Sequence, residues 1–119
     1  MDKSWALSFA DQWVRDWNSH DIKAVLAHFA DDVVFTSPLA ARVIPESGGV
    51  VRGKEALRAY WTQAFSQVPD LRLELVSLFV GVSTVVIGFR NQKGDLRGEV
   101  LEFDNGLVVR GHATDLVTG

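Results

Sequence analysis

The hydrophobic period of this chain changes once, near residue 70, and this change restricts the fold class more than any other feature. Before it, apolar residues recur every three to four positions, which is typical of the buried face of an α-helix. Four aromatic residues share that face in the first such segment: Trp5, Phe9, Trp13 and Trp17. The pattern predicts helices over 3–18, over 21–29 with Asp21 as N-cap, and over 54–68.

After residue 70 the apolar residues alternate or form short β-branched runs, which predicts strands. The expected strands are 71–75, 83–90, 96–103 and 107–115, with hairpin turns at 93–95 and 104–106. An earlier strand, 33–37, ends at Pro38, and residues 39–52 show no period and are expected to form a loop. Three helices followed by hairpin-linked strands predict one α+β domain over 1–119, with helices on one face of a mostly antiparallel sheet.

The composition excludes several classes of function. The chain has no cysteine, which excludes disulfides, zinc–thiolate sites and thiol nucleophiles and agrees with a cytoplasmic location. Its net charge of −3, with basic residues scattered, argues against nucleic-acid binding. No apolar run is long enough to span a membrane. The scattered histidines and acids show no metal-ligand spacing, so neither a metal nor a cofactor is expected.

Four segments resemble a known group of proteins. They are 17–22 (WNSHDI), 28–35 (HFADDVVF), 51–57 (VRGKEAL) and 103–109 (FDNGLVV). In this order and at these gaps they resemble the nuclear transport factor 2-like superfamily, especially its SnoaL-like and ketosteroid-isomerase-like bacterial members. The resemblance implies a cone-shaped, cystatin-like roll with a deep pocket, and a homodimer formed through the sheet. It does not imply one activity, because the superfamily includes enzymes of several kinds and non-catalytic binding domains.

The ketosteroid-isomerase-like members imply three functional positions, of which two differ here. Ser37 stands where these enzymes place a carboxylate base, and Trp13 where they place an oxyanion-binding tyrosine. A hydroxyl without an activating base does not readily take a proton from carbon near neutral pH, and an indole N–H donates a hydrogen bond without shuttling a proton. Glu99 matches the third position, a carboxylic acid that faces the pocket.

Strand alternation places Glu99 on one face with Arg97, Leu101 and Phe103. If this face is concave, Glu99 is a buried acid or base, either paired with Arg97 or uncharged with a raised pKa. If the parity is reversed or a bulge intervenes, Glu99 lies on the surface.

The resemblance also directs Asp115, on the last strand, toward the pocket mouth. Asp115 is therefore a third candidate catalytic residue beside Glu99 and Arg97. With Arg90 added, the same side chains contain the arginine and acids that epoxide hydrolysis needs, provided that they converge.

The histidines are expected to have other roles. His112 is predicted on the outer face of the sheet or against a dimer partner, with action as a base as the alternative. His20, in the turn between helices, and His28, expected to point outward, are predicted to be structural.

Aromatic residues dominate the predicted pocket wall. The residues expected to line it are Trp13, Trp17, Phe35, Ser37, Tyr60, Trp61, Phe65, Leu101 and Phe103. Each aromatic residue is also compatible with ordinary core packing, but together they suit an apolar ring-bearing or acyl ligand. The segment 39–51, with Arg42, Ile44 and Glu46, is expected to act as a lid over the mouth.

Two functional hypotheses follow. The first is a SnoaL-like protein that binds a small apolar molecule and performs isomerase-, cyclase- or hydrolase-type chemistry with Glu99 as acid or base. The second is a non-catalytic ligand-binding or dimerisation module, which the serine at position 37 and the tryptophan at position 13 favour.

Overall fold

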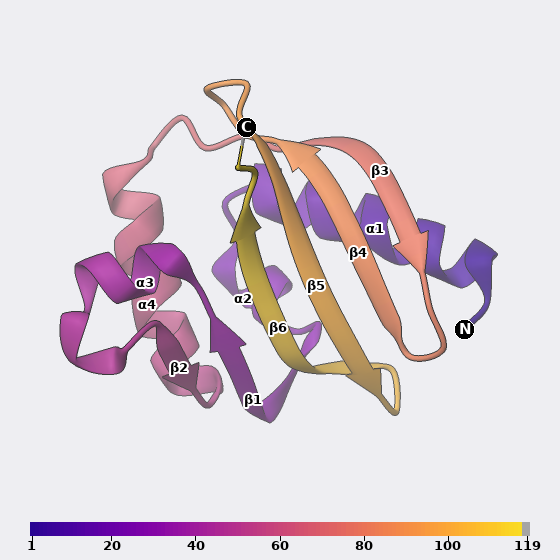
Figure 1. Ribbon diagram of the computed structural model, residues 1–119, viewed down its shortest axis with the longest axis horizontal. Coiled ribbons are helices and arrows are strands. Elements are labelled where there is room, and N and C mark those ends of the chain that lie inside the picture. The colour runs from indigo at the N-terminus through magenta and orange to yellow at the C-terminus, as the bar shows by residue number, and fades with distance from the viewer. Residues whose placement is uncertain (118–119) are drawn as a thin grey trace.

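The computed structural model describes residues 1–117 and shows helices followed by a strand-rich second half (Figure 1). The helices are α1 (Lys3–Asn18), α2 (Ile22–Leu26), α3 (Pro38–Val43), the 3₁₀ turn η1 (Pro45–Ser47) and α4 (Lys54–Gln67). The strands are β1 (Phe29–Thr36), β2 (Val50–Arg52), β3 (Glu74–Val80), β4 (Thr84–Arg90), β5 (Leu96–Asp104) and β6 (Leu107–Asp115). The predicted α+β class is confirmed. Residues 118 and 119 of the predicted domain lie outside the described part.

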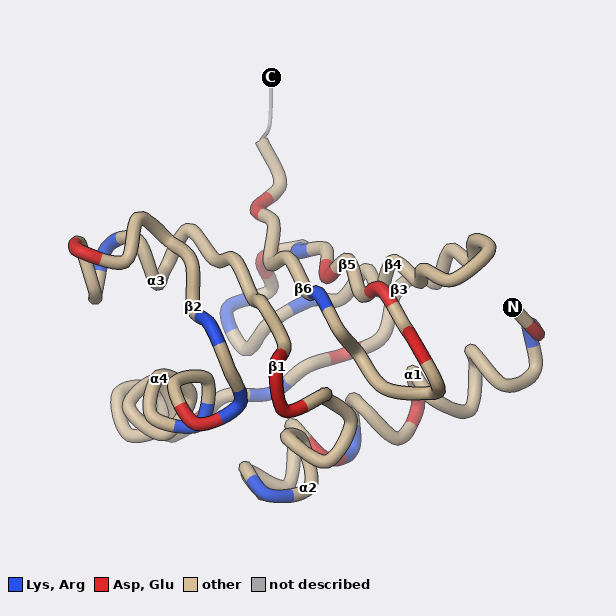
Figure 2. Tube along the Cα trace, turned by 90° about the horizontal axis from the view of Figure 1, so that it is seen from below, with Lys and Arg blue, Asp and Glu red and all other residues tan. Residues whose placement is uncertain are grey.

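The strands form one sheet in the order β2-β1-β6-β5-β4-β3. Neighbouring strands are antiparallel except β1 and β6, which run parallel. Helices α1, α2 and α4 lie on one side of this sheet (Figure 2). The hydrophobic core fills the space between these helices and the sheet. No helix within residues 1–117 is both long and apolar enough to cross a membrane.

Helix α2 is shorter than predicted, because a strand replaces its last turn. Asp21 caps the helix as expected, accepting a hydrogen bond from the Ala24 amide at 3.1 Å. The helix ends at Leu26, and Phe29 begins β1 as a fully buried residue opposite Val108. Pairing with the distant strand β6 and burial of the Phe29 ring therefore override the local helical pattern.

The prediction of a loop over 39–52 was wrong. Pro38 ends β1, but it also begins α3, since proline suits the first helical position and Ser37 caps the helix. After η1, strand β2 returns antiparallel along β1, with Val51 opposite Phe35. The structure thus has a fourth α-helix and a further edge strand.

The strand predicted over 71–75 begins later than expected, as β3 at Glu74 rather than Leu71. The segment before it is held by the end of α1. The Asn18 side chain donates to the Leu73 carbonyl at 2.9 Å and accepts from the Leu73 amide at 2.7 Å. A ring nitrogen of His20 lies 2.7 Å from the Leu71 carbonyl oxygen. These side chains satisfy backbone groups that a strand would otherwise pair.

Candidate functional site

A cavity of about 330 Å³ lies between the helices and the inner face of the sheet. Helices α1 and α4 and strands β1, β4, β5 and β6 supply its walls, and α3 and the turn between β4 and β5 lie at its mouth. Eight of the predicted site residues line it: Trp13, Trp17, Phe35, Ser37, Tyr60, Trp61, Arg97 and Glu99. Four segments that are far apart in the sequence, 13–17, 35–37, 60–61 and 97–99, therefore meet at one site.

Three residues predicted to line the pocket lie elsewhere. Phe65 packs against Trp17 with ring centroids 5.3 Å apart, and Phe103 packs against Phe9 at 4.9 Å. Leu101 is fully buried, and its side chain packs beside Gly111 of the neighbouring strand β6. Toward this end of the sheet α1 packs on β5 through Phe9 and Phe103, so Leu101 and Phe103 form core instead of cavity wall.

Several lining residues were not predicted. They are Ala64, Val68, Leu71, Leu73, Phe89, Asn91, Gln92 and Lys93. Alternation along β4 could have identified Phe89, which faces inward with Val85 and Ile87. The turn residues carry no such signal, because only the curvature of the sheet brings the β4–β5 turn to the mouth.

Glu99 is the buried acid of the cavity. The middle of β5 carries it, opposite Ala113 on β6 and Ile87 on β4, and its exposed fraction is 8%. Burial alone raises the pKa of its carboxyl from 4.5 to about 8. At neutral pH the group is therefore mostly protonated and can donate a hydrogen bond or a proton. The alternative in which reversed strand parity places Glu99 on the surface is therefore excluded.

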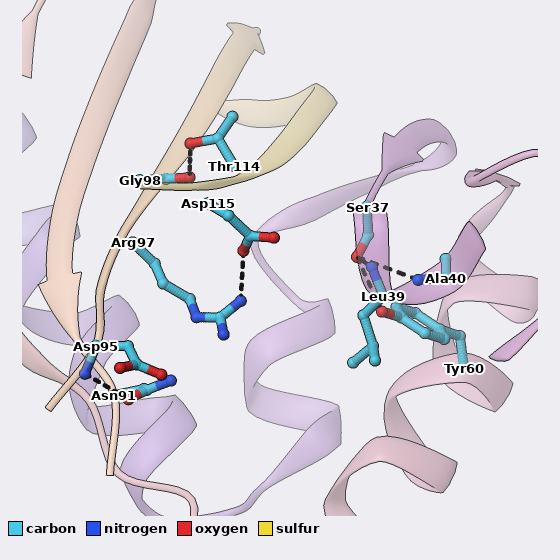
Figure 3. A network of polar contacts seen from close by, with 10 residues as sticks. All are labelled: Ser37, Leu39, Ala40, Tyr60, Asn91, Asp95, Arg97, Gly98, Thr114 and Asp115. Atoms are coloured by element: carbon cyan, nitrogen blue, oxygen red, sulfur yellow. Dashed lines mark hydrogen bonds and ion pairs between the residues drawn. The ribbon is translucent and has the colours of Figure 1, made fainter. Parts of the chain in front are cut away.

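Arg97 does not pair with Glu99. Its Nη1 lies 2.5 Å from Oδ1 of Asp115, its cross-strand neighbour on β6 (Figure 3). Asp115 itself is exposed and does not line the cavity, contrary to the prediction. Arg90 lies on the outward side of β4 and donates to the Gly94 carbonyl at 3.2 Å. The arginine-and-acid grouping considered for epoxide hydrolysis is therefore not assembled.

The hydrogen bonds of Ser37 explain why a hydroxyl stands at this position. Its Oγ accepts from the amides of Leu39 and Ala40, at 3.2 and 3.4 Å, and thereby caps α3. It also lies 3.0 Å from Oη of Tyr60 (Figure 3). Burial is the main cause that raises the pKa of the Tyr60 hydroxyl, which therefore stays protonated. No base contacts Ser37 among residues 1–117, so these hydroxyls form a neutral polar edge of the cavity.

Three buried nitrogen donors in the lining lack an acceptor within residues 1–117: Nε1 of Trp13, Nε1 of Trp17 and Nε of Arg97. A buried donor without a partner costs about 1–3 kcal/mol. The wall thus offers three unpaired N–H donors to a bound ligand.

The histidines lie outside the cavity. His112 is on the outer face as predicted, with Nδ1 2.7 Å from Oγ1 of Thr36 and Nε2 3.7 Å from Glu102. His28 does not point outward: its Nε2 lies 2.7 Å from Asp16, against α1. Nowhere in residues 1–117 do three metal-ligating side chains come together.

The predicted lid is a structured segment. Arg42, on α3, lines the mouth, whereas Ile44 and Glu46 do not. The carbonyl of Gly49 accepts from the Ser37 amide at 2.9 Å, so the segment is tied to the end of β1 at both of its ends.

Comparison with known proteins agrees with this architecture. The family model of the SnoaL-like domain matches residues 10–111. A SnoaL-like protein of unknown function from Burkholderia thailandensis E264 is 36% identical, with 98% of each chain covered and a TM-score of 0.92.

Two more distant structures share the fold. An NTF2-like protein of unknown function from Burkholderia pseudomallei K96243 is 20% identical, with 93% of this chain and 90% of that chain covered and a TM-score of 0.71. TerC, co-crystallised with polyporic acid, is 13% identical, with 93% and 91% covered and a TM-score of 0.77. No curated protein matches the sequence. The chain belongs to the SnoaL-like family, and it shares its fold with an NTF2-like protein.

Proposed function

We propose that this protein binds a small, flat, largely apolar molecule in the cavity and that Glu99 acts on it as a protonated acid. The observation that carries the proposal is the Glu99 carboxyl, which is buried in the cavity wall and has a pKa raised to about 8 by burial alone. A carboxyl in this state donates to a ligand oxygen and stabilises the negative charge that develops on it.

The walls suit such a ligand. Trp13, Trp17 and Trp61 supply flat apolar surface, and the cavity volume lies in the range of small-molecule sites. TerC, which shares the fold, was co-crystallised with polyporic acid. The family membership supports small-molecule binding in the same way.

The chemistry that this wall supports is acid assistance. Isomerases, cyclases and hydrolases that act beside a carbonyl all gain from a donor at its oxygen. Tyr60 offers a second hydroxyl in the same cavity. The hydroxyl of Ser37 caps a helix and does not replace a carboxylate base, so abstraction of a proton from carbon requires a base brought by the substrate or by water.

A matched pair of substitutions on α4 tests binding. Ala64 lines the cavity, whereas Ala59 is exposed on the same helix. We expect Ala64→Phe to abolish fluorescence enhancement of N-phenyl-1-naphthylamine and Ala59→Phe to leave it unchanged. Binding that survives Ala64→Phe would place the ligand elsewhere and refute the proposal.

Glu99→Gln then separates chemistry from recognition. The amide keeps the shape of the side chain but supplies no proton. We expect probe binding to persist, and turnover of any substrate identified for the cavity to fall by about 10²–10⁴-fold. Unchanged turnover would favour the second hypothesis, a non-catalytic binding module.

We also propose self-association through the outer face of the sheet. A row of cross-strand partners runs across this face: Phe79, Val86, Val100, His112 and Thr36. Phe79 is 64% exposed, which is unusual for a large apolar side chain. A second copy of the chain, laid on this row, would bury it. Sedimentation that shows only a 13.1 kDa species would refute this proposal.

A further inference from the structure

We propose that the ligand of this cavity is an organic anion, with its apolar body against the tryptophans and its acidic group at the mouth between Arg42 and Lys93. This inference rests on the proposed ligand-binding function and adds the charge and orientation of the ligand.

Two cations from different elements lie at the mouth. Arg42 comes from α3 and Lys93 from the turn between β4 and β5, and both are exposed lining residues. Neither forms an ion pair with a carboxylate anywhere in residues 1–117. A third lining cation, Arg97, is already compensated by Asp115. Arg42 and Lys93 therefore remain available to a negative group of the ligand.

The acids of the cavity do not offset this charge. Glu99 is the single carboxylic acid among the lining residues that the structure describes. Burial keeps it mostly uncharged at neutral pH. The cavity is therefore positive at its mouth, although the chain as a whole carries a net charge of −3. A local field opposite in sign to the overall charge favours entry of anions at this point of the surface.

The depth of each group fixes the orientation. The three tryptophans and Glu99 are buried, whereas Arg42 and Lys93 are exposed at the opening. An amphiphilic acid therefore enters with its ring or chain first and keeps its carboxylate or equivalent group at the partly hydrated mouth. There each exposed ion pair strengthens binding by about two- to fivefold.

Two fluorescent probes with the same ring body test the charge. 8-Anilinonaphthalene-1-sulfonate is anionic, and N-phenyl-1-naphthylamine is its neutral counterpart. The test variant is Arg42→Gln with Lys93→Gln. The control is Lys23→Gln with Arg52→Gln, which removes the same total charge from exposed positions that do not line the cavity.

We expect the test variant to weaken the anionic probe about tenfold and the neutral probe less than twofold, since two exposed ion pairs are lost. The control variant should change neither probe by more than twofold. Added salt should weaken the anionic probe in the parent protein and have little effect in the test variant. An anionic probe that is indifferent to the test variant, or equally weakened by the control, overturns the inference.

Ala64→Phe distinguishes this failure from failure of the proposed function. If Ala64→Phe leaves both probes bound, the cavity is not the site, and the proposed function and the inference both fail. If Ala64→Phe displaces both probes while the anionic probe ignores Arg42 and Lys93, the binding function stands and the inference alone is overturned.

Discussion

Strand β5 carries two glutamates, one on each face, and their surroundings differ. Glu99 lies on the inner face, is 8% exposed, and has its pKa raised to about 8 by burial. Glu102, three residues later, lies on the outer face, where its carboxylate is 3.7 Å from His112. The helices α1, α2 and α4 cover only the inner side (Figure 2). Which face a residue occupies thus decides whether its carboxyl is buried in the cavity wall or lies at the surface beside a histidine.

The apolar residues show the same contrast. On the inner face Val85, Ile87 and Leu101 are fully buried beneath the helices. On the outer face Val86 and Val100 are only half-buried, and Phe79 stands exposed. The inner face therefore stabilises the monomer and shapes the cavity, and the outer face is the part of the sheet left for an interaction.

The largest expected effect contrasts one aromatic residue from each face. Trp13→Ala removes a fully buried ring and should lower the free energy of unfolding by about 3–5 kcal/mol. Phe79→Ala should cost less than about 1 kcal/mol in dilute protein but shift sedimentation toward the monomer. Urea unfolding and sedimentation velocity measure the two quantities. Equal destabilisation by both substitutions would show that Phe79 is packed, and the contrast between the faces would fail.

The next effect is the pH dependence that Glu99 produces. Its pKa is about 8 in the folded protein and near 4.5 when unfolded, so the folded state binds the proton more tightly. The contribution of Glu99 to stability should therefore be fully present below about pH 4.5, be lost as pH rises from about 4.5 to 8, and stay constant above, with a total loss on the order of 3–5 kcal/mol.

Glu99→Gln should remove this decline and make the protein more stable than the parent above pH 8. Glu74→Gln, at an exposed position on β3, is the matched control and should follow the parent curve. Unfolding free energies measured from pH 5 to pH 9 compare the three proteins. A Glu99→Gln variant with the parent slope would show that Glu99 is hydrated and charged.

The smallest effect concerns the cap at the cavity edge. Ser37→Ala removes the acceptor of the Leu39 and Ala40 amides and the partner of Tyr60, and should cost about 1–2 kcal/mol. Ser66→Ala, whose hydroxyl bonds only to the Gln63 carbonyl on the exposed side of α4, should cost a few tenths. Thermal unfolding resolves the difference, and equal costs would argue against a structural role for Ser37.

Part of the site could be read from the sequence because alternation is a local property. The period of two correctly assigns Glu99 and Arg97 to one face of β5, and helical spacing correctly gathers Trp13 and Trp17 on one side of α1. Alternation does not say where along a face the helices touch the sheet. Leu101 and Phe103 share the parity of Glu99 but lie where α1 closes against β5, so they belong to the core.

The sequence by itself determined the α+β class, the main helices, the hairpin turns and the inward direction of Glu99, because each depends on neighbours within a few residues. The tertiary structure alone decided that 38–52 contains α3 and β2, that Arg97 pairs with Asp115, and that Arg42 and Lys93 line the same cavity. These features depend on register and curvature, which arise from contacts between residues far apart in the chain. The change of period near residue 70 thus specifies a mainly helical first part and a strand-rich second part. The packing of these two parts creates the cavity between them.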